Sequence, residues 1–564
     1  MVSRFTYETQ AKEGSSRTGR RPNCGFATKT IGSDASFGRA SGMKFDVVIA
    51  GGGFAGAYCA KALGQALGRE VGTARVALIA ERNVLIFQPM LAEVVGASLS
   101  PQDVVNPLRQ FCRGVTVLQG RIHAVDVTRK ELTIDGGRFT RNQVVGYEHL
   151  VVALGHVTDL SKVPGMTEYG WPMKTVSDAL RLRSALINRL EEANLVEDPA
   201  VRARLLTFVV VGGGYTGVET AGQLHALVSE SLRLYSRLKG SLPRVILVHS
   251  QAQLLAEIGP ELGAYAQQVL ERNEVEVKLN TRVTEVTATR ALLSDGTSIE
   301  AATLVSTIGN APNPIVLDLC RQLGIEADRG RIPVSAMLQS ERHPTLWAAG
   351  DCARVPWNDR GTEKVSPPTA QFAMRQGTQL GQNLARALRG TPLRPFHYRY
   401  LGQLATIGSR EAVAEVLGFH FRGFIAWWLW RTIYLAKLPG IMRRLRVMID
   451  WTFELVFTRD ISLVQPPPED LIRAIHLEKG ELLFVRDEKP RAFYYLRRGR
   501  ILLKDADGRE SVLETGCVID QGLLGRRDTW PCDATAAESS DLIVFRGKAF
   551  EMLRKELMLS RQPQ

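Results

Sequence analysis

Two glycine-rich fingerprints constrain the fold of this chain more than any other feature. The first runs from Gly51 to Gly56 and the second from Gly212 to Gly217, both with the spacing G-x-G-x-x-G. Each follows a short apolar run rich in Val and opens a helical pattern, which predicts a strand, a tight turn and a helix. The three glycines allow the turn, the approach of backbone to a pyrophosphate, and helix–strand packing. Two fingerprints therefore predict two bound dinucleotides, with electron transfer between them.

Composition narrows the class of partners. The chain has 564 residues, enough for roughly three or four units, and 45% of them are hydrophobic. The net charge of +13 predicts attraction to an anionic surface. Because no dense Lys/Arg run with interleaved aromatic residues indicates a nucleic acid, an acidic membrane is the favoured partner. The sequence contains no run of about 18 apolar residues, so we expect no helix that spans a membrane.

Two further features concern the compartment. The seven cysteines are scattered without a C-x-x-C pair, which indicates a reducing compartment with no disulfide framework and no metal site. Residues 1–42 are rich in Arg, Gly, Ser and Thr. They predict either a disordered extension or an organelle transit peptide, and the sequence leaves both open.

Strand patterns that end at glycine outline the organisation of the chain. In the first unit, the second strand, Arg75–Ala80, ends at Glu81, where a ribose diol needs an acceptor. Apolar runs that end at a glycine predict further buried strands at 150–155, 304–309 and 345–350. Because the last of these follows the second fingerprint unit, we expect that unit to be inserted into the first.

Five segments of the sequence indicate a family. They are the first fingerprint, Phe87–Leu91 with Asn106–Arg109, the second fingerprint with Val218–Gly222, Ala349–Asp351, and Pro367–Gln371. Phe-Gln-Pro and Pro-Pro-Thr-Ala-Gln are far more specific than either glycine loop. Across 44–462 the chain resembles type II NADH dehydrogenases, which are single-subunit, non-proton-pumping NADH:quinone oxidoreductases that contain FAD.

The resemblance implies an α/β fold with two Rossmann-like dinucleotide-binding domains, the FAD domain being split by the inserted NADH domain. The implied cofactors are FAD and NADH, with NADPH possible, and the implied acceptor is a membrane quinone. The divisions are a disordered extension at 1–42, the first FAD part at 43–165, the NAD(P)H domain at 166–325, the second FAD part at 326–418, amphipathic membrane-binding helices at 419–463 and a β-roll at 464–564.

Position by position, the resemblance implies which residues hold the two cofactors. Glu81 would hold the adenosine ribose of FAD, and Asp351 would bind the ribityl chain from a helix start. The FAD set is Gly51, Gly52, Gly53, Phe54, Ala55, Gly56, Glu81, Arg82, Gln88, Pro89, Ile122, Ala153, Gly155, Asp351 and Ala370. The NADH set is Gly212, Gly214, Tyr215, Thr216, Gly217, His249 and Gly309.

Three polar residues are candidates for catalysis. Glu219 follows the second fingerprint, where it either compensates a helix dipole in the first turn or serves as a gate or proton relay for the quinone. Gln371 and Gln376 resemble the family's quinone motif, since an amide can donate to a quinone carbonyl without adding charge. Their spacing places them about 140° apart on a helix, so we favour Gln371.

The end of the second unit's second strand departs from the family pattern. His249 and Ser250 stand where a carboxylate usually accepts from both ribose hydroxyls. Imidazole neither accepts as well nor repels a 2′-phosphate, which puts NADH preference in doubt. We still expect NADH, because no Arg follows the strand to pair with a phosphate.

Residues 424–457 indicate contact with a membrane. Trp427, Trp428 and Trp430 stand among arginines, and Pro439-Gly440 divides the stretch in two. The apolar piece is too short to span a bilayer but suits the headgroup region. The alternative is a helix packed on the protein's own core. We expect peripheral association through 419–460, at the cytoplasmic face of the cell membrane, or at an organelle inner membrane if 1–42 is a transit peptide.

The tail resembles a cyclic-nucleotide-binding β-roll. Pro466–Pro468 would be a linker, Asp520–Gly522 the phosphate turn, and 548–558 a terminal helix. Trp530–Asp533 stands where the phosphate-binding Arg is expected, and without that guanidinium a phosphate diester loses its main partner. We therefore expect a packing or regulatory module rather than a nucleotide sensor.

Other functions compete with this interpretation. Sulfide:quinone oxidoreductases and disulfide reductases share the scaffold, but both need a redox cysteine pair that this chain lacks near the first unit. A regulatory flavoprotein with the tail as output is a different class. A homodimer is also possible, and the sequence does not identify the quinone.

Overall fold

The computed structural model describes residues 43–68, 75–137, 140–359, 362–454, 457–462, 472–488, 490, 492–519 and 529–546. These fall into two compact units, a large one up to Gln465 and a small one from Pro466 on, and each is described by itself. The predictions for 1–42, for the Pro466–Pro468 linker, for the turn at 520–522 and for a helix at 548–558 lie outside the described residues.

The first sheet of the large unit is mostly parallel and leads into the first fingerprint. β1, β2, β5, β8 and β20 pair in parallel, while β6 and β7 form an antiparallel extension. Every residue of β2 is buried, as expected for a parallel sheet covered by helices. In spatial order the strands are β5 (Thr116–Gln119), β2 (Val76–Ala80), β1 (Met43–Ala50), β8 (Gln143–Val152), β7 (Glu131–Asp135) and β6 (Arg121–Asp126), with β20 (Leu346–Ala348) against β8.

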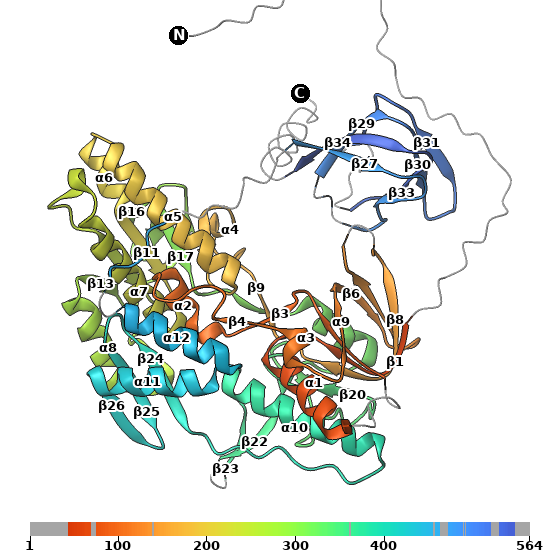
Figure 1. Cartoon of the computed structure of the whole chain (residues 1–564), viewed down its shortest axis with the longest axis horizontal. Coiled ribbons are helices and arrows are strands. Elements are labelled where there is room, and N and C mark those ends of the chain that lie inside the picture. Colours follow the sequence, from red (N-terminus) through yellow and green to blue (C-terminus); the bar gives the residue numbers. More distant parts are fainter. Residues whose placement is uncertain are drawn as a thin grey trace, which may run out of the picture. The chain divides into compact units, whose positions relative to one another are not determined.

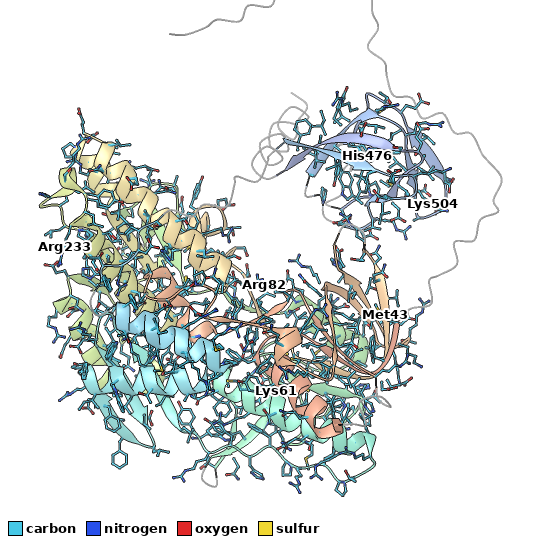
Figure 2. All side chains as sticks on the ribbon, viewed as in Figure 1. Met43, Lys61, Arg82, Arg233, His476 and Lys504 are labelled. Carbon is cyan, nitrogen blue, oxygen red and sulfur yellow. The ribbon has the colours of Figure 1, made fainter. Side chains whose placement is uncertain are left out.

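Helices α1 (Phe54–Leu67) and α10 (Ala370–Leu388) lie side by side (Figure 1). Two glycines of α10 allow this close approach. A Cβ on Gly377 would lie 2.1 Å from the carbonyl oxygen of Ala55, and one on Gly381 would lie 2.5 Å from that of Cys59. The packing fixes α10 against the helix that opens at the first fingerprint. Figure 2 labels Met43 at the start of β1 and Lys61 on α1.

A second parallel sheet carries the second fingerprint. Its order is β10 (Gly170–Pro172), β17 (Thr303–Ser306), β11 (Thr207–Val211), β12 (Arg244–Val248) and β13 (Val275–Lys278). Its helices are α5 (Val176–Leu195), α6 (Pro199–Leu205), α7 (Tyr215–Leu232) and α8 (Pro260–Arg272), and β14 (Val283–Val286), β15 (Arg290–Leu293) and β16 (Ser298–Glu300) form an antiparallel sheet beside it. All these elements fall between β8 and β20 in sequence. The predicted α/β fold, with one Rossmann-like unit inserted into another, is confirmed.

Shorter elements join the two sheets of the large unit. β9, which follows β8 of the first sheet, pairs antiparallel with β18, which follows β17 of the second sheet. This pair connects the two sheets. The short elements are β3 (Val84–Ile86), α2 (Leu91–Val95), β4 (Val105–Pro107), α3 (Leu108–Phe111), β9 (His156–Thr158), α4 (Met166–Tyr169), β18 (Asn310–Pro312), α9 (Pro314–Leu323), β19 (Ile332–Pro333), β21 (Ala353–Arg354), β22 (Pro356–Asp359) and β23 (Thr362–Val365), with 3₁₀ turns at Gln88–Met90, Ser236–Leu238 and Ala256–Ile258.

The large unit ends in a small antiparallel sheet and two helices. The sheet consists of β24 (Gly402–Thr406), β25 (Ala412–Val416) and β26 (Phe419–Arg422), and the helices are α11 (Gly423–Lys437) and α12 (Ile441–Phe453). The prediction of helix from 419 onward was wrong for the first four residues, which are strand. The predicted break at Pro439-Gly440 is confirmed, since α11 ends before it and α12 begins after it.

The small unit is built from antiparallel strands around its own core. Phe484 and Trp530 stack at its centre with ring centroids 4.1 Å apart. Trp530 is therefore a core residue. One sheet contains β27 (Ile472–Leu477), β34 (Ser540–Arg546), β29 (Ala492–Arg498) and β32 (Val518–Ile519), and the other contains β28 (Leu482–Phe484), β33 (Asp533–Ala536), β30 (Ile501–Lys504) and β31 (Glu510–Leu513).

Candidate functional site

A cavity of about 1000 Å³ lies in the large unit and is lined by both fingerprint regions. Its wall also includes the start of α10, the start of strand β24 and the end of α11. The predicted site residues that line it are Gly51, Gly52, Gly53, Phe54, Ala55, Glu81, Arg82, Gln88, Pro89, Ile122, Ala153, Gly155, Tyr215, Thr216, Glu219, Asp351, Ala370 and Gln371. Those that do not are Gly56, Gly212, Gly214, Gly217, His249, Gly309 and Gln376.

The first fingerprint forms an open cradle. Gly51 has a φ of 119°, and a Cβ there would lie 2.2 Å from the carbonyl oxygen of Ala153. A Cβ on Gly56 would lie 1.8 Å from the carbonyl oxygen of Gly51, so helix and strand touch there. A Cβ on Gly53 would meet no atom within 4 Å, and no side chain caps α1. This open space beside uncapped amides fits the pyrophosphate of FAD.

The second fingerprint repeats this geometry. Gly212 has a φ of 113°, and a Cβ on Gly217 would lie 1.7 Å from the Gly212 carbonyl oxygen. Gly214, like Gly53, faces open space, and no side chain caps α7. Gly217 therefore serves the contact between helix and strand, which is why it lies behind the cavity wall, while Tyr215 and Thr216 line the cavity.

Glu81 lies directly after β2, as predicted. Arg121 donates to its Oε1 from Nη2 at 2.6 Å and from Nε at 3.1 Å. Both side chains are about half exposed, so this pair contributes little stability. Its geometric effect is to fix Oε1, while the residue lines the cavity and Oε2 stays available to accept from a ribose hydroxyl. Arg82 follows Glu81 and is labelled near the middle of the large unit in Figure 2.

Asp351 lies in a tight turn between β20 and β21. The expectation that it starts a helix was wrong, because the chain returns at once into a strand. Burial raises the pKa of the Asp351 carboxyl, and His156 and Lys174 oppose that rise. Gln376 supports the turn from behind: its Oε1 accepts from the Gly350 N–H at 2.8 Å, and its Nε2 donates to Ser366 Oγ at 2.8 Å.

Gln371 and Gln376 therefore have different surroundings. Gln371 lines the cavity, and its Oε1 accepts from the Tyr398 hydroxyl at 2.9 Å. Its Nε2 donates to the Gly402 carbonyl at 3.1 Å. Gln376 is only 2% exposed and has both ends of its amide engaged inside the protein. The two amides therefore do not face one surface, which agrees with the separation expected from their helical spacing.

Glu219 is the fifth residue of α7, beyond the first turn in which we expected it. It lines the cavity although its side chain is buried, and its Oε1 accepts from the Thr406 N–H at 3.3 Å. Burial raises the pKa of its carboxyl to about 8. A carboxyl with such a pKa can hold or release a proton near neutral pH, which a dipole-compensating carboxylate would not do.

His249 lies at the end of β12, but its ring packs against the fingerprint rather than lining the cavity. Its Nδ1 accepts from the Gly213 N–H at 3.0 Å, and burial lowers its pKa. The imidazole is therefore neutral. It has neither the negative charge that would repel a 2′-phosphate nor a positive charge that would attract one. Gly309 also lies outside the cavity wall, where its carbonyl accepts from the Asp159 N–H at 2.7 Å.

Sequence reasoning missed several cavity-lining residues. Tyr434 and Lys437 come from the inner face of α11, and burial lowers the pKa of the Lys437 ammonium. His156 opens β9 and Lys174 follows β10, and Lys174 Nζ donates to the His156 carbonyl at 2.6 Å. A lysine three residues after an aromatic on an apolar helix was the available signal for Lys437. We found no comparable signal for Lys174.

The outer faces of α11 and α12 are apolar. Trp427 and Trp430 pack inward, whereas Trp428 is 56% exposed, so the three tryptophans do not share one face of α11. We call the following exposed set the apolar face: Phe424, Ile425, Trp428, Ile441, Met442, Leu445, Met448, Ile449 and Phe453. No helix among the described residues is long and apolar enough to cross a membrane.

Three protein families match consecutive parts of the chain. Residues 45–377 match the pyridine nucleotide-disulphide oxidoreductases, 400–460 match the NDH2 C-terminal domain, and 474–556 match the cyclic nucleotide-binding domain. The second match begins at β24, so the C-terminal part of the large unit includes the small antiparallel sheet as well as the helices.

Individual proteins resemble the chain over most of their length. The type II NADH:quinone oxidoreductase NdhA of Mycobacterium tuberculosis is 34% identical over 423 residues, which is 73% of this chain and 87% of that protein. The type II NADH:quinone oxidoreductase Ndh of the same organism is 32% identical over 431 residues, covering 73% and 88%. The structure of NDH2 from Plasmodium falciparum in complex with NADH has a TM-score of 0.67 at 18% identity, covering 74% of this chain and 99% of that one, and shows the fold alone.

Proposed function

The chain belongs to the type II NADH:quinone oxidoreductases, and on that premise we propose that it transfers two electrons from NADH through bound FAD to a membrane quinone, without pumping protons. One observation carries the proposal: a single cavity is lined by both fingerprint regions and by α11, the helix with an apolar outer face. FAD, when bound, supplies the hydride acceptor and the two-electron donor. The protein's own residues position both substrates and exclude water.

We propose that the first fingerprint and its neighbours hold FAD. The amides that open α1 take the pyrophosphate in the space beside Gly53. Glu81 accepts a hydrogen bond from the adenosine ribose with Oε2, the oxygen that Arg121 leaves free. Ile122, the residue after Arg121, lines the cavity where the adenine would lie. At the other end, Gln376 fixes the turn that presents Asp351 to the ribityl chain.

NADH enters against the second fingerprint in this proposal. The start of α7 takes its pyrophosphate, since Gly214 leaves the same open space as Gly53. The hydroxyl of Tyr215 donates to Gln403 Oε1 and so joins the start of α7 to strand β24. His249 stands where the family pattern has a carboxylate, and its Nδ1 already accepts from the Gly213 N–H. That atom therefore does not accept a hydrogen bond from the ribose diol. We expect NADH to be the better substrate, with measurable use of NADPH.

In this proposal, residues of α10 and α11 line the part of the cavity that binds the quinone. Gln371 uses one amide hydrogen to hold the Gly402 carbonyl, and its second hydrogen can donate to a quinone oxygen. Lys437 offers a further donor, and Glu219 holds a proton at neutral pH. These three groups supply hydrogen bonds and a proton where a quinone must accept both.

We propose that the apolar face lies on the lipid surface. Its members surround the outer sides of the helix that also lines the cavity, so a water-insoluble quinone can enter from the lipid without crossing water. Arginines on α12 and the net charge of +13 favour an anionic headgroup layer. The protein would then be peripheral at the cytoplasmic face of the cell membrane, or at an organelle membrane.

Steady-state turnover tests the proposed function. The purified protein, reconstituted with FAD, should oxidise NADH with a short-chain quinone as acceptor, whereas sulfide should not replace NADH. A sulfide:quinone oxidoreductase needs reactive thiols beside the flavin, and no cysteine is among the described residues that line the cavity. Turnover with sulfide but not with NADH would contradict the proposal.

The small unit is proposed as a packing or regulatory module. Trp530 occupies its core, where it stacks on Phe484, and presents no guanidinium to a phosphate. If the protein were instead a redox sensor, the small unit would carry its output. A homodimer is also compatible with the proposal, and sedimentation of the detergent-solubilised protein would measure it.

A further inference from the structure

A second buried carboxyl lies directly behind the cavity wall. On the short helix α2, Leu91 and Ala92 line the cavity, and the next residue, Glu93, does not. The Glu93 side chain is 2% exposed, and its Oε2 accepts from the Trp451 indole N–H at 2.9 Å. This carboxyl lies between the cavity and the helices that carry the apolar face.

Glu93 and Glu219 interact with each other inside the protein. Both are buried on helices that pack together, α2 and α7, and the charge of Glu93 raises the pKa of Glu219. Burial is the main cause of the raised pKa of each, to about 7 for Glu93 and about 8 for Glu219. Two neighbouring carboxyls with pKa values this close can exchange a proton at little cost.

Neither carboxyl is held as part of a structural ion pair. Among the described residues, the arginines of this region pair with other acids: Arg431 Nη2 lies 2.6 Å from Glu454, and Arg459 contacts Glu454 and Glu230. Glu93 and Glu219 form no ion pair with any described residue. A buried, unpaired carboxyl carries a desolvation penalty that a merely structural position would not retain.

A partly exposed carboxyl, that of Glu454, lies near Glu93 at the end of α12. The Glu454 side chain is 18% exposed at the end of α12, and its charge raises the pKa of Glu93. Arg431 and Arg459 act on Glu93 in the opposite direction. The groups that face Glu93 are therefore Glu219 on α7, Arg431 on α11, Trp451 and Glu454 on α12, and Arg459 beyond it.

The proposed reaction needs a route for a proton. NADH, one proton and a quinone give NAD⁺ and a quinol, so one proton per turnover must reach the quinone from solvent. We propose that Glu93 is a proton-relay residue that passes this proton from the Glu454 side to Glu219, which then donates to the quinone. Each carboxyl loses one proton and regains one per cycle, and no electrons pass through them. The inference rests on the proposed function and adds a second residue to it.

The Glu93→Gln variant tests the relay, with Glu230→Gln as the matched control. Glu230 belongs to the same cluster, where it pairs with Arg459, but its side chain is 32% exposed and it is not among the cavity-lining residues. Two acceptors are compared: a short-chain quinone, which takes up protons, and ferricyanide, which takes electrons alone. We expect Glu93→Gln to lower kcat with quinone by about tenfold or more and to leave ferricyanide reduction within about twofold.

The pH profile and the infrared spectrum give readouts that a packing defect would not mimic. Quinone reduction by the wild type should show an ionisation near the Glu93 pKa of about 7, and Glu93→Gln should lose it while Glu93→Asp keeps it. A protonated-carboxyl band that responds to NADH should also disappear in Glu93→Gln and persist in Glu230→Gln.

The outcomes separate the relay from the function on which it rests. If the wild type reduces quinone, and Glu93→Gln matches Glu230→Gln in rate, pH profile and infrared band, the relay is wrong and the proposed function stands. A general loss of both activities in Glu93→Gln with an unchanged pH profile would also overturn the relay. Failure of the wild type itself to reduce quinone with NADH would contradict the proposed function.

Discussion

Gly53 and Gly214 occupy equivalent places in the two fingerprints, and both differ from the glycines around them. Gly51 and Gly212 need a positive φ, and Gly56 and Gly217 are required for close backbone contact. Gly53 and Gly214 have φ values of −73° and −79°, and a Cβ on either would meet only open space. The fold itself therefore leaves room for a Cβ at both positions, so glycine there is explained by a ligand that approaches the backbone.

This difference gives a paired prediction. Gly53→Ala should fold with a Tm close to that of the wild type, because a methyl group there meets no protein atom and a change at a helix cap costs at most about 1 kcal/mol. It should nevertheless lose FAD, which the absorbance of the purified protein measures. Gly214→Ala should keep FAD and raise the KM for NADH by about tenfold. Retention of full FAD by Gly53→Ala would contradict the assignment of the first cradle.

Glu219 predicts a pH dependence of stability. Its folded pKa of about 8 lies above the ordinary value of 4.5, so between these two values the folded state binds more protons than the unfolded state. The contribution of Glu219 to the free energy of unfolding therefore falls as the pH rises from 4.5 to 8, and it is constant above that range. Glu219→Gln removes this dependence. Thermal unfolding should show the variant gaining Tm relative to the wild type from about pH 5 to about pH 9; a constant difference would rule out the raised pKa.

At the scale of elements, α11 has two functions. Its inner face supplies Tyr434 and Lys437 to the cavity, and its outer side carries part of the apolar face. The neighbouring helix α12 carries the rest (Figure 1). Ile441, at the start of α12, is 74% exposed, and so is Leu242, in the loop before β12. The two residues therefore form a matched pair for a membrane-binding experiment.

Ile441→Glu should weaken binding to vesicles that contain anionic lipid by about tenfold or more, since burial of such a side chain is worth roughly 1.5–3 kcal/mol. Leu242→Glu should bind like the wild type. Co-sedimentation with vesicles measures both, and NADH:ferricyanide activity verifies that each variant is folded. Equal binding by the two variants would place the membrane surface elsewhere.

Arg459, in the segment after α12, joins that segment to the rest of the large unit from a buried position. The Arg459 side chain is 4% exposed, donates to the Gly96 carbonyl at 2.7 Å and to Gln223 Oε1 at 3.0 Å, and pairs with Glu230 and Glu454. Arg459→Met leaves Glu230 without its ion-pair partner and leaves Glu454 paired with Arg431 alone. We expect a loss of roughly 3 kcal/mol in unfolding free energy. Arg237→Met, which breaks an exposed pair with Glu197, should cost less than about 1 kcal/mol. Denaturant unfolding compares them, and similar losses would disprove the special role of Arg459.

The sequence predicted elements well where the signal is local. The strand–glycine–helix patterns of both fingerprints and the break at Pro439-Gly440 are set by neighbouring residues, and all three are observed. Two predictions failed for physical reasons. Asp351 looked like a helix start, but the chain re-enters a strand at Ala353, and β24–β26 were missed because such short strands carry little periodic signal.

Long-range contacts were beyond reach of the sequence. Trp451 reaches Glu93 across 358 positions, and Arg459 reaches Gly96 across 363. No pattern near Glu93 distinguishes it from an ordinary helical glutamate. Its burial and its neighbour Glu219 are consequences of tertiary packing, so the relay could be inferred only from the structure.

The whole molecule comprises two units with separate cores, and the described core of the small unit contains none of the cavity-lining residues. Deletion of 466–564 should therefore leave FAD content unchanged and NADH:quinone turnover within about twofold. A redox sensor would lose its output on this deletion while turnover persisted. Loss of FAD or of turnover on deletion would show that the small unit belongs to the catalytic machinery.

The central claim is that one cavity connects NADH to a quinone through a flavin. Anaerobic stopped-flow absorbance of the FAD-loaded protein tests it most directly, with NADH mixed first and a quinone second. We predict that NADH bleaches the flavin absorbance within a single turnover and that the quinone restores it with production of one quinol per flavin. A flavin that stays oxidised with excess NADH, or stays reduced with excess quinone, would contradict the account.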